Sequence, residues 1–186
     1  LVMAQSGYLG ATEPIEGKFG YFNLYADNEI SDFSIFETYG TEFEVMNTAV
    51  KPYPCCRFSH ATIDAVLDIT QSNKIKHNEI LNIDISMGKT GYDMVGYSPN
   101  FPTNTVEAQF SAYFAAAVAA IKGEYLWDSY QLIGDKTLEE VMGKVNVTQE
   151  IFQHEMQSNI SLTTQNGETY KHNVEYPKGE PEHPVS

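Results

Sequence analysis

The chain has 186 residues, of which 42% are hydrophobic and 19% charged, a composition typical of globular domains that bury a core. The net charge of −14 argues against nucleic acid as a partner, and no apolar run reaches the roughly 18 residues of a membrane helix, so we expect no membrane partner. The two cysteines are adjacent, a spacing that strains a disulfide, so we expect a reducing, cytoplasmic setting.

Residues 1–47 are predicted to form short helices or turns joined by loops, because glycine and proline interrupt every periodic pattern there. This segment looks like the edge of a larger structure and is rich in aromatic residues: Phe19, Tyr21, Phe22, Tyr25, Phe33, Phe36, Tyr39 and Phe43. The chain also starts at Leu1 rather than Met, so we interpret it as a fragment or a processed chain.

The middle of the chain contains clearer periodic patterns. Residues 45–50 are a short strand candidate, and Ser59 can cap a following helix with helically spaced apolar positions. Residues 81–87 alternate with period two, which predicts a strand whose buried face carries Leu81, Ile83, Ile85 and Met87. A long helix is then predicted from a cap at Thr105 to Gly123.

The last third predicts a short helix and a hairpin. Thr137 and Glu140 form a capping-box pattern. Residues 160–164 and 169–176 flank Asn166-Gly167, which favours a two-residue hairpin turn. The order of these elements predicts an α+β fold with a small, largely antiparallel sheet and packed helices.

Tests for common catalytic and metal-binding motifs are negative, which leaves the stretch "KPYPCCRFSH", residues 51–60, as the candidate site. It holds Lys51, the chain's only arginine, Arg57, and His60, which can move protons near neutral pH. Two cations beside a helix start would suit a carboxylate, and arginine binds carboxylates in a bidentate manner. From spacing alone a structural role is favoured: the prolines end a strand, Lys51 is solvated, and His60 packs against its helix.

A resemblance to a known family favours the functional role of this stretch over the structural one. "KPYPCCRFSHATIDAV", residues 51–66, resembles the signature of the MmgE/PrpD family, in which a lysine, prolines and a cysteine or polar residue precede a histidine that opens a helix running into "IDA". "TVEAQFSAYFAAAVAAIKG", residues 105–123, and the tail "YPKGEPEHPVS", residues 176–186, are similar to two further family segments in the same order. "EGKFGYF", residues 16–22, resembles the family more loosely.

The resemblance implies a domain organisation. Family members combine an all-helical domain, built from both chain ends, with an inserted α+β lid domain. Residues 1–47 would then be the end of the helical domain, residues 48–176 the lid, and residues 177–186 an extended tail returning toward C-terminal helices that are missing here. We therefore interpret the chain as a fragment of a longer enzyme.

The resemblance also implies a chemistry. The family includes 2-methylcitrate dehydratase, cis-aconitate decarboxylase and an iminodisuccinate epimerase, which transfer a proton next to a carboxylate of a small di- or tricarboxylic acid without cofactor or metal. Lys51 and His60 match catalytic positions, while Arg57 and Cys56 would bind substrate. Cys56 stands where some decarboxylases have a histidine, which weakens the decarboxylase interpretation.

The resemblance thus predicts a cofactor-free lyase or epimerase that acts on a polycarboxylate, forms a homodimer, and is inactive as the isolated fragment. Two alternatives stay open. One is a carboxylate-binding module without turnover, and the other is a structural or interaction domain.

Overall fold

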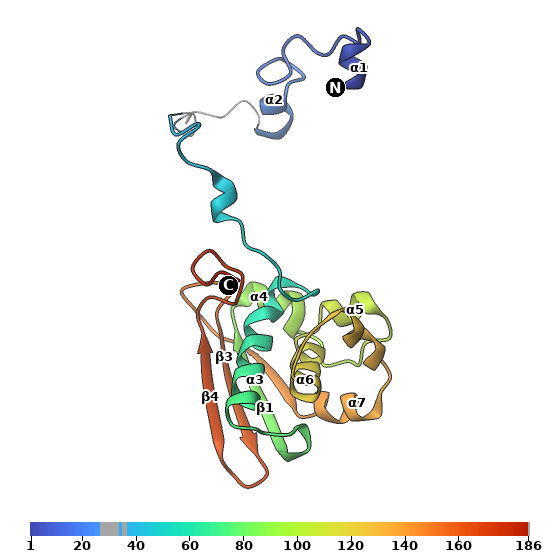
Figure 1. Ribbon diagram of the computed structural model, residues 1–186, viewed down its shortest axis with the longest axis vertical. Coiled ribbons are helices and arrows are strands. Elements are labelled where there is room, and N and C mark those ends of the chain that lie inside the picture. Colours follow the sequence, from blue (N-terminus) through green and yellow to red (C-terminus); the bar gives the residue numbers. More distant parts are fainter. Residues whose placement is uncertain (27–33, 35–36, 186) are drawn as a thin grey trace. The chain divides into compact units, whose positions relative to one another are not determined.

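The computed structural model describes residues 1–26, 34 and 37–185, so the aromatic residues Phe33 and Phe36 noted above lie outside the described residues. The chain divides into two units, Leu1–Met46 and Asn47–Ser186 (Figure 1). No helix in the described part is long and apolar enough to cross a bilayer.

The first unit contains short helices. Helix α1 (Val2–Gln5) ends before Gly7, whose φ of +82° suits a residue without a side chain, and α2 spans Tyr21–Ala26. Residues 45–50 are not the predicted strand: Glu44–Asn47 form a 3₁₀ turn, η2, in which the Met46 amide donates to the Phe43 carbonyl. The Val50 amide bonds to Gly179 instead of to a neighbouring strand, so the segment has no sheet to join.

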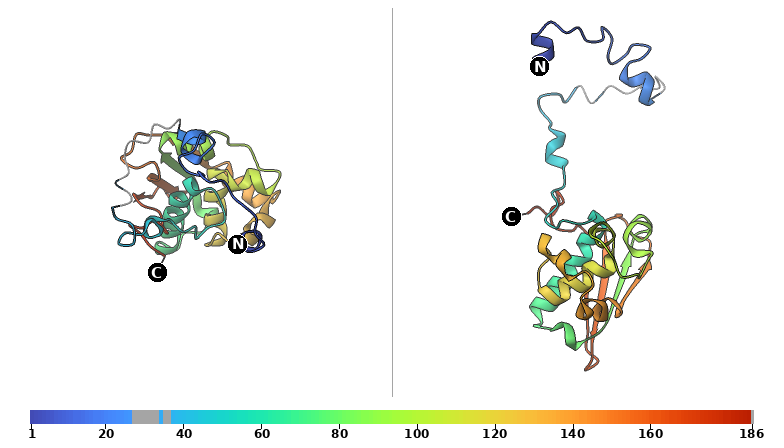
Figure 2. Two further views of the ribbon diagram at one scale, coloured as in Figure 1. Left: turned by 90° about the horizontal axis from the view of Figure 1, so that it is seen from above. Right: turned by 90° about the vertical axis from the view of Figure 1, so that its right-hand side faces the viewer.

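The second unit is built on a four-stranded sheet in the order β2-β1-β3-β4. The strands are β1 (Ile80–Met87), β2 (Val145–Gln149), β3 (Ser158–Thr164) and β4 (Thr169–Val174). Strand β1 runs parallel to β2 and antiparallel to β3, and β3 runs antiparallel to β4. Helices cover one face of this sheet, as both Figure 1 and Figure 2 show. The α+β prediction with a largely antiparallel sheet is therefore confirmed.

Strand β1 differs from its prediction at one end. Ile83, Ile85 and Met87 are buried as expected, but Leu81 is 55% exposed and Ile80 is fully buried in its place. The pairing of β1 with β3 shifts register between Ile80 and Asn82, which marks a bulge. One extra residue reverses the alternation of side chains, so the period-two prediction is wrong on the N-terminal side of the bulge, at Leu81.

The hairpin between β3 and β4 is present, with a different turn. The Thr164 amide donates to the Glu168 carbonyl at 2.9 Å, and the Gly167 amide donates to the Thr164 carbonyl at 2.9 Å. Gly167 has a φ of +89°. These bonds enclose three loop residues rather than two, because Gly167 takes the left-handed position that closes a three-residue loop.

Helix α3 (His60–Ser72) follows a 3₁₀ turn, η3 (Arg57–Ser59). Of its helically spaced positions Ile63, Val66, Leu67 and Thr70, all but the half-buried Leu67 are buried. The Ser59 side chain makes no capping bond, contrary to expectation. The predicted long helix is broken into α5 (Thr105–Gln109) and α6 (Ala112–Lys122).

The break has a local cause, because two separate N-caps are present. Asn104 accepts from the Glu107 amide, and Ser111 accepts from the Phe114 amide at 3.2 Å. Helix α7 (Lys136–Met142) is likewise capped by Asp135, not by the predicted Thr137. The remaining helical turns are η4 (His77–Glu79), α4 (Lys89–Gly91), η5 (Tyr92–Gly96) and η6 (Trp127–Leu132).

The core of the second unit lies between the sheet and helices α3 and α6. Helix α3 packs against α6, β3 and β4, while α6 also packs against α7 and β2. Alanines fill most of α6, and Phe114 there is fully buried against the rings of Tyr125 and Tyr130. Small residues let α6 approach α3 closely, while the aromatic group closes the end of the core that faces residues 51–57.

Candidate functional site

Residues 51–57, here called the Lys51 loop, are held in place by hydrogen bonds to the helices beside them. The Cys56 amide donates to the Gln109 carbonyl at 2.9 Å, and Gln109 Nε2 donates to the Pro54 carbonyl at 3.2 Å. Tyr130 Oη donates to the same Pro54 carbonyl at 2.6 Å. A backbone carbonyl has two lone pairs, so Pro54 can accept both bonds, and together with the Cys56 amide they fix the loop against α5 and η6.

Lys51 lies at the open side of this loop. Its residue is exposed, and Nζ donates to the Cys55 carbonyl at 3.3 Å. It makes no ion pair with any residue that the structure describes. A lysine ammonium has three donors, so two remain available to a ligand.

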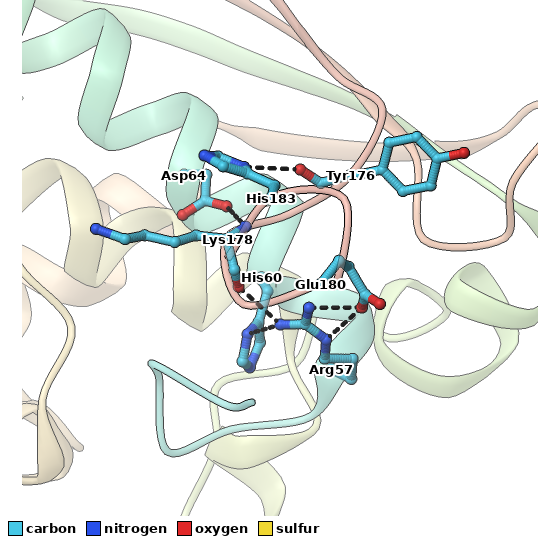
Figure 3. A network of polar contacts seen from close by, with 7 residues as sticks. All are labelled: Arg57, His60, Asp64, Tyr176, Lys178, Glu180 and His183. Carbon is cyan, nitrogen blue, oxygen red and sulfur yellow. Dashed lines mark hydrogen bonds and ion pairs between the residues drawn. The ribbon is translucent and has the colours of Figure 1, made fainter. Parts of the chain in front are cut away.

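Arg57 lies within a network of polar contacts (Figure 3). Its Nε and Nη2 donate to Glu180 Oε1 at 2.8 and 2.5 Å, and its Nη1 donates to the Lys178 carbonyl at 3.1 Å. The side chains of Arg57 and Glu180 are only 12% and 17% exposed. The predicted substrate-binding guanidinium is thus engaged within the chain, with a single N–H left over.

His60 completes this network. Arg57 Nη1 lies 2.6 Å from His60 Nδ1, and because arginine can only donate, Nδ1 accepts and Nε2 carries the hydrogen. The ring is fully buried and packs edge-on against Tyr53. Burial lowers the pKa of His60 from 6.5 to about 4, and the charge of Arg57 adds to this effect. His60 is therefore neutral at physiological pH and does not reach the surface of this unit.

The His60 ring also lies near the backbone of the Lys51 loop. Nε2 makes no hydrogen bond of good geometry, although the carbonyls of Cys55 and Tyr53 lie near enough to raise the pKa in part. Ser59 Oγ and Thr62 Oγ1 are also buried without a partner among the described residues. Unpaired buried polar groups cost free energy, so this short stretch carries strain that an ordinary helix start does not.

Both cysteines are free and lie in packing positions. Cys55 is buried, and that burial, together with the neighbouring Cys56, raises the pKa of its thiol to about 12. A thiol with that pKa is not a nucleophile at neutral pH. Cys56 is half-buried and packs against the core, so its predicted contact with substrate would use the exposed remainder of its side chain.

The tail after β4 returns to the start of the Lys51 loop, which the order of elements did not predict. The Lys178 amide donates to Asp64 Oδ2 at 2.7 Å, and the Val50 amide donates to the Gly179 carbonyl at 2.8 Å. Asp64 also accepts from Tyr53 Oη at 2.6 Å. Sequence reasoning missed Asp64, Gly179 and Glu180. A lone buried arginine requires a carboxylate partner, yet sequence offers no means to choose among the many acidic residues.

The predicted site residues differ in how they are placed. No group of three or more histidine, cysteine or acidic side chains that could hold a metal ion occurs in the described part of the chain. Lys51, Cys56, Arg57 and His60 all lie in one short stretch, but of the two cations only Lys51 is an exposed residue without an acidic partner among the described residues. A nearby cavity of about 420 Å³ is lined by residues of the segment 97–111, and none of the four predicted residues lines it.

Comparison with known proteins identifies the family of this chain. Curated proteins give no match. The model of the MmgE/PrpD C-terminal domain matches residues 53–186, which takes in His60, α5, α6, the whole sheet and the tail. The match begins two residues after Lys51, so the assignment of Lys51 to a position of the family signature rests on the motif resemblance alone. Because the match covers well over half of the chain, the chain belongs to the MmgE/PrpD family.

Proposed function

We propose that this chain forms the lid side of a cofactor-free lyase or epimerase, which transfers a proton next to a carboxylate of a small di- or tricarboxylic acid, as 2-methylcitrate dehydratase does. One observation supports this proposal above the others. Two residues before the family match, Lys51 is an exposed residue whose ammonium has no acidic partner among the described residues, on a loop whose backbone is fixed from two sides.

The chemistry needs such a group. Removing a proton next to a carboxylate builds negative charge on that carboxylate, and a fixed cation lowers the energy of this state. A lysine on a mobile loop would first have to be ordered, which reduces its contribution. The bonds from Gln109 and Tyr130 to Pro54 remove that cost here.

We assign the two engaged residues more limited roles. Arg57 acts on substrate through the shape of the loop, because its donors are used by Glu180, Lys178 and His60. His60 can take part in proton transfer only in a conformation that uncovers its ring. We assign proton abstraction to the all-helical domain that the family resemblance implies.

The test is solvent exchange by the full-length protein. Proton NMR in deuterated water would follow 2-methylcitrate, citrate and cis-aconitate. We expect exchange or turnover of one of them, and Lys51→Ala should lower kcat/KM by about 100-fold or more, mainly through kcat. Lys171→Ala, a change at an exposed lysine on β4, is the control and should stay within about twofold of wild type.

The 186-residue chain alone should show no exchange, because the groups that abstract the proton would be absent. An inert full-length protein, or a Lys51→Ala variant as active as wild type, would contradict the proposal.

One observation favours the non-catalytic alternative, a carboxylate-binding or structural domain. Arg57 and His60, the two residues best suited to chemistry, are both engaged inside the chain. Calorimetry of the full-length protein separates the cases: citrate binding that depends on Lys51, without turnover of any acid, would support the binding module.

A further inference from the structure

We infer that Glu180 is a positioning residue for the Lys51 ammonium. Residues 178–180, here called the tail clasp, bind both ends of the Lys51 loop and thereby hold it in one shape. The catalytic consequence rests on the proposed function, while the clasp itself can be tested without it.

The first contact is at the start of the loop, where Gly179 meets Val50. The Val50 amide donates to the Gly179 carbonyl at 2.8 Å. Gly179 has a φ of +95°, and a Cβ atom there would lie 2.1 Å from the Val50 carbonyl oxygen and 3.0 Å from Pro52 Cδ. Only glycine allows the tail to pass this close to the backbone that leads into Lys51.

The second contact is at the end of the loop, where Glu180 binds Arg57. The two side chains are mostly buried, and one carboxylate oxygen accepts from both Nε and Nη2. Charge-assisted bonds of this kind are the stronger class of hydrogen bonds. Glu180 also neutralises Arg57, so the loop presents one uncompensated cation, Lys51, instead of two.

The third contact fixes the orientation of the clasp. Lys178 donates its amide to Asp64 on α3 at 2.7 Å, and its carbonyl accepts from Arg57 at 3.1 Å. Three consecutive tail residues therefore touch Asp64, Val50 and Arg57, which lie on α3 and on the two sides of the loop.

Glu180 and the Lys51 ammonium both bind the backbone segment between Val50 and Arg57, Glu180 through the Arg57 side chain and Lys51 through a carbonyl. Glu180 holds Arg57, and Arg57 Nη1 holds the His60 ring at Nδ1 (Figure 3). Lys51 Nζ donates to the Cys55 carbonyl at 3.3 Å, and Cys55 lies between Val50 and Arg57, the two points that the clasp holds. Loss of Glu180 frees the Arg57 end of this segment, and with it the carbonyl that orients Lys51.

The lone arginine allows a direct test on the 186-residue chain. An arginine-specific protease can cut this chain only after Arg57. Glu180→Ala should raise the native-state cleavage rate by about tenfold or more, since loss of a partly buried ion pair increases local opening. Glu182→Ala, which removes an exposed carboxylate from the same tail, should leave the rate unchanged. Equal cleavage of wild type and Glu180→Ala would overturn the clasp.

A second variant tests the other end of the loop. Gly179→Ala should speed hydrogen exchange of the Val50 amide by tenfold or more on the same scale, measured by NMR. Gly134→Ala is the matched control, because Gly134 also has a positive φ, +82°, but open space where the Cβ would lie. Unchanged exchange at Val50 in Gly179→Ala would count against the clasp even if Glu180→Ala failed to fold.

The catalytic part of the inference needs the full-length protein and a double-mutant cycle. Glu180→Ala should lower kcat more than it changes KM, with partial rescue in Glu180→Gln, which keeps an oxygen acceptor. Combined with Lys51→Ala it should add little further loss, because both changes remove the same fixed cation. Additive losses would mean a merely structural role and would overturn the positioning assignment. If wild type turns over none of the acids, the proposed function fails, while the protease and exchange experiments still decide the clasp.

Discussion

The buried His60 ring should make the stability of the second unit depend on pH in a defined direction. Its pKa falls from 6.5 to about 4 on folding, so between these values the unfolded chain binds a proton that the folded chain does not. The stability that the neutral ring contributes is fully present above pH 6.5. It is lost progressively as the pH falls toward 4.

The magnitude follows from the same two values. A difference of one pKa unit corresponds to about 1.4 kcal/mol, so acidification from pH 7.5 to pH 4 should remove about 3 kcal/mol of unfolding free energy through His60 alone. The cause is burial first and the neighbouring positive charge of Arg57 second, with a smaller effect of Lys51 in the same direction. The carbonyls of Cys55 and Tyr53 oppose it in part.

Urea unfolding across this pH range would measure the effect. Circular dichroism is the better probe, because Trp127 is 66% exposed and reports poorly on the core. The informative quantity is the difference between wild type and His60→Gln, because effects of pH that the two proteins share cancel in it. In His60→Gln the glutamine oxygen can still accept from Arg57. That difference should change by about 3 kcal/mol between pH 7.5 and pH 4.

Two results would refute this reasoning. One is a difference between wild type and His60→Gln that stays constant with pH. The other is an NMR titration of wild type in which the His60 ring protonates near 6.5, which would mean that the ring is solvated and not held by Arg57. The second measurement remains decisive if His60→Gln does not fold.

Two further changes test the network and the core. Arg57→Met should destabilise the second unit by about 2–4 kcal/mol in urea unfolding, because Glu180 and His60 Nδ1 lose their donor in a mostly buried setting. The control is Lys89→Met, at an exposed ion pair with Asp93, which should cost below about 0.5 kcal/mol. Equal effects of the two would mean that the Arg57 network contributes no more than a surface pair. Phe114→Ala should cost about 3–5 kcal/mol, because the fully buried ring stacks on Tyr130 at 5.9 Å, and a loss below 1 kcal/mol would contradict the assigned packing.

The elements that sequence predicted well are those specified by local pattern. The alternation of Ile83, Ile85 and Met87 and the presence of a hairpin around Asn166-Gly167 each follow from a few neighbouring residues, although the loop has three residues rather than the predicted two. The errors arise where a distant contact decides. A bulge against β3 moves Leu81 outward, and β2 is stable only because β1 lies parallel to it, with Val145 and Val147 as its two buried residues. Neither partner is visible within the segment itself.

Helix ends are also hard to predict from apolar spacing. The apolar spacing from Thr105 to Gly123 fits one helix, and nothing in that spacing predicts a break. The caps at Asn104 and Ser111 divide it because each side chain finds a helical amide to bind. Serine and asparagine compete with helix continuation in this way wherever packing permits.

Sequence suggested which residues form the candidate site, but not which of their side chains bind other parts of the chain. The resemblance singled out Lys51, Cys56, Arg57 and His60 together, and the family match covers the last three. That Arg57 turns inward could not be predicted, because its partner Glu180 is 123 residues away and has many acidic competitors. Sequence identifies which side chains are rare, whereas the tertiary structure decides which of them remain free.

That long separation also has a consequence for biosynthesis. At a translation rate of about 5–20 residues per second, roughly 6–25 s pass between the synthesis of Arg57 and that of Glu180. Throughout this interval the nascent loop lacks its contacts with residues 178–180, and α3 has not yet met the strands that cover it. A partly made lid therefore carries an accessible arginine and an unformed core, which are features that chaperones and cellular proteases recognise. Truncations that remove the last nine residues should accordingly leave a chain that is degraded faster than the intact one.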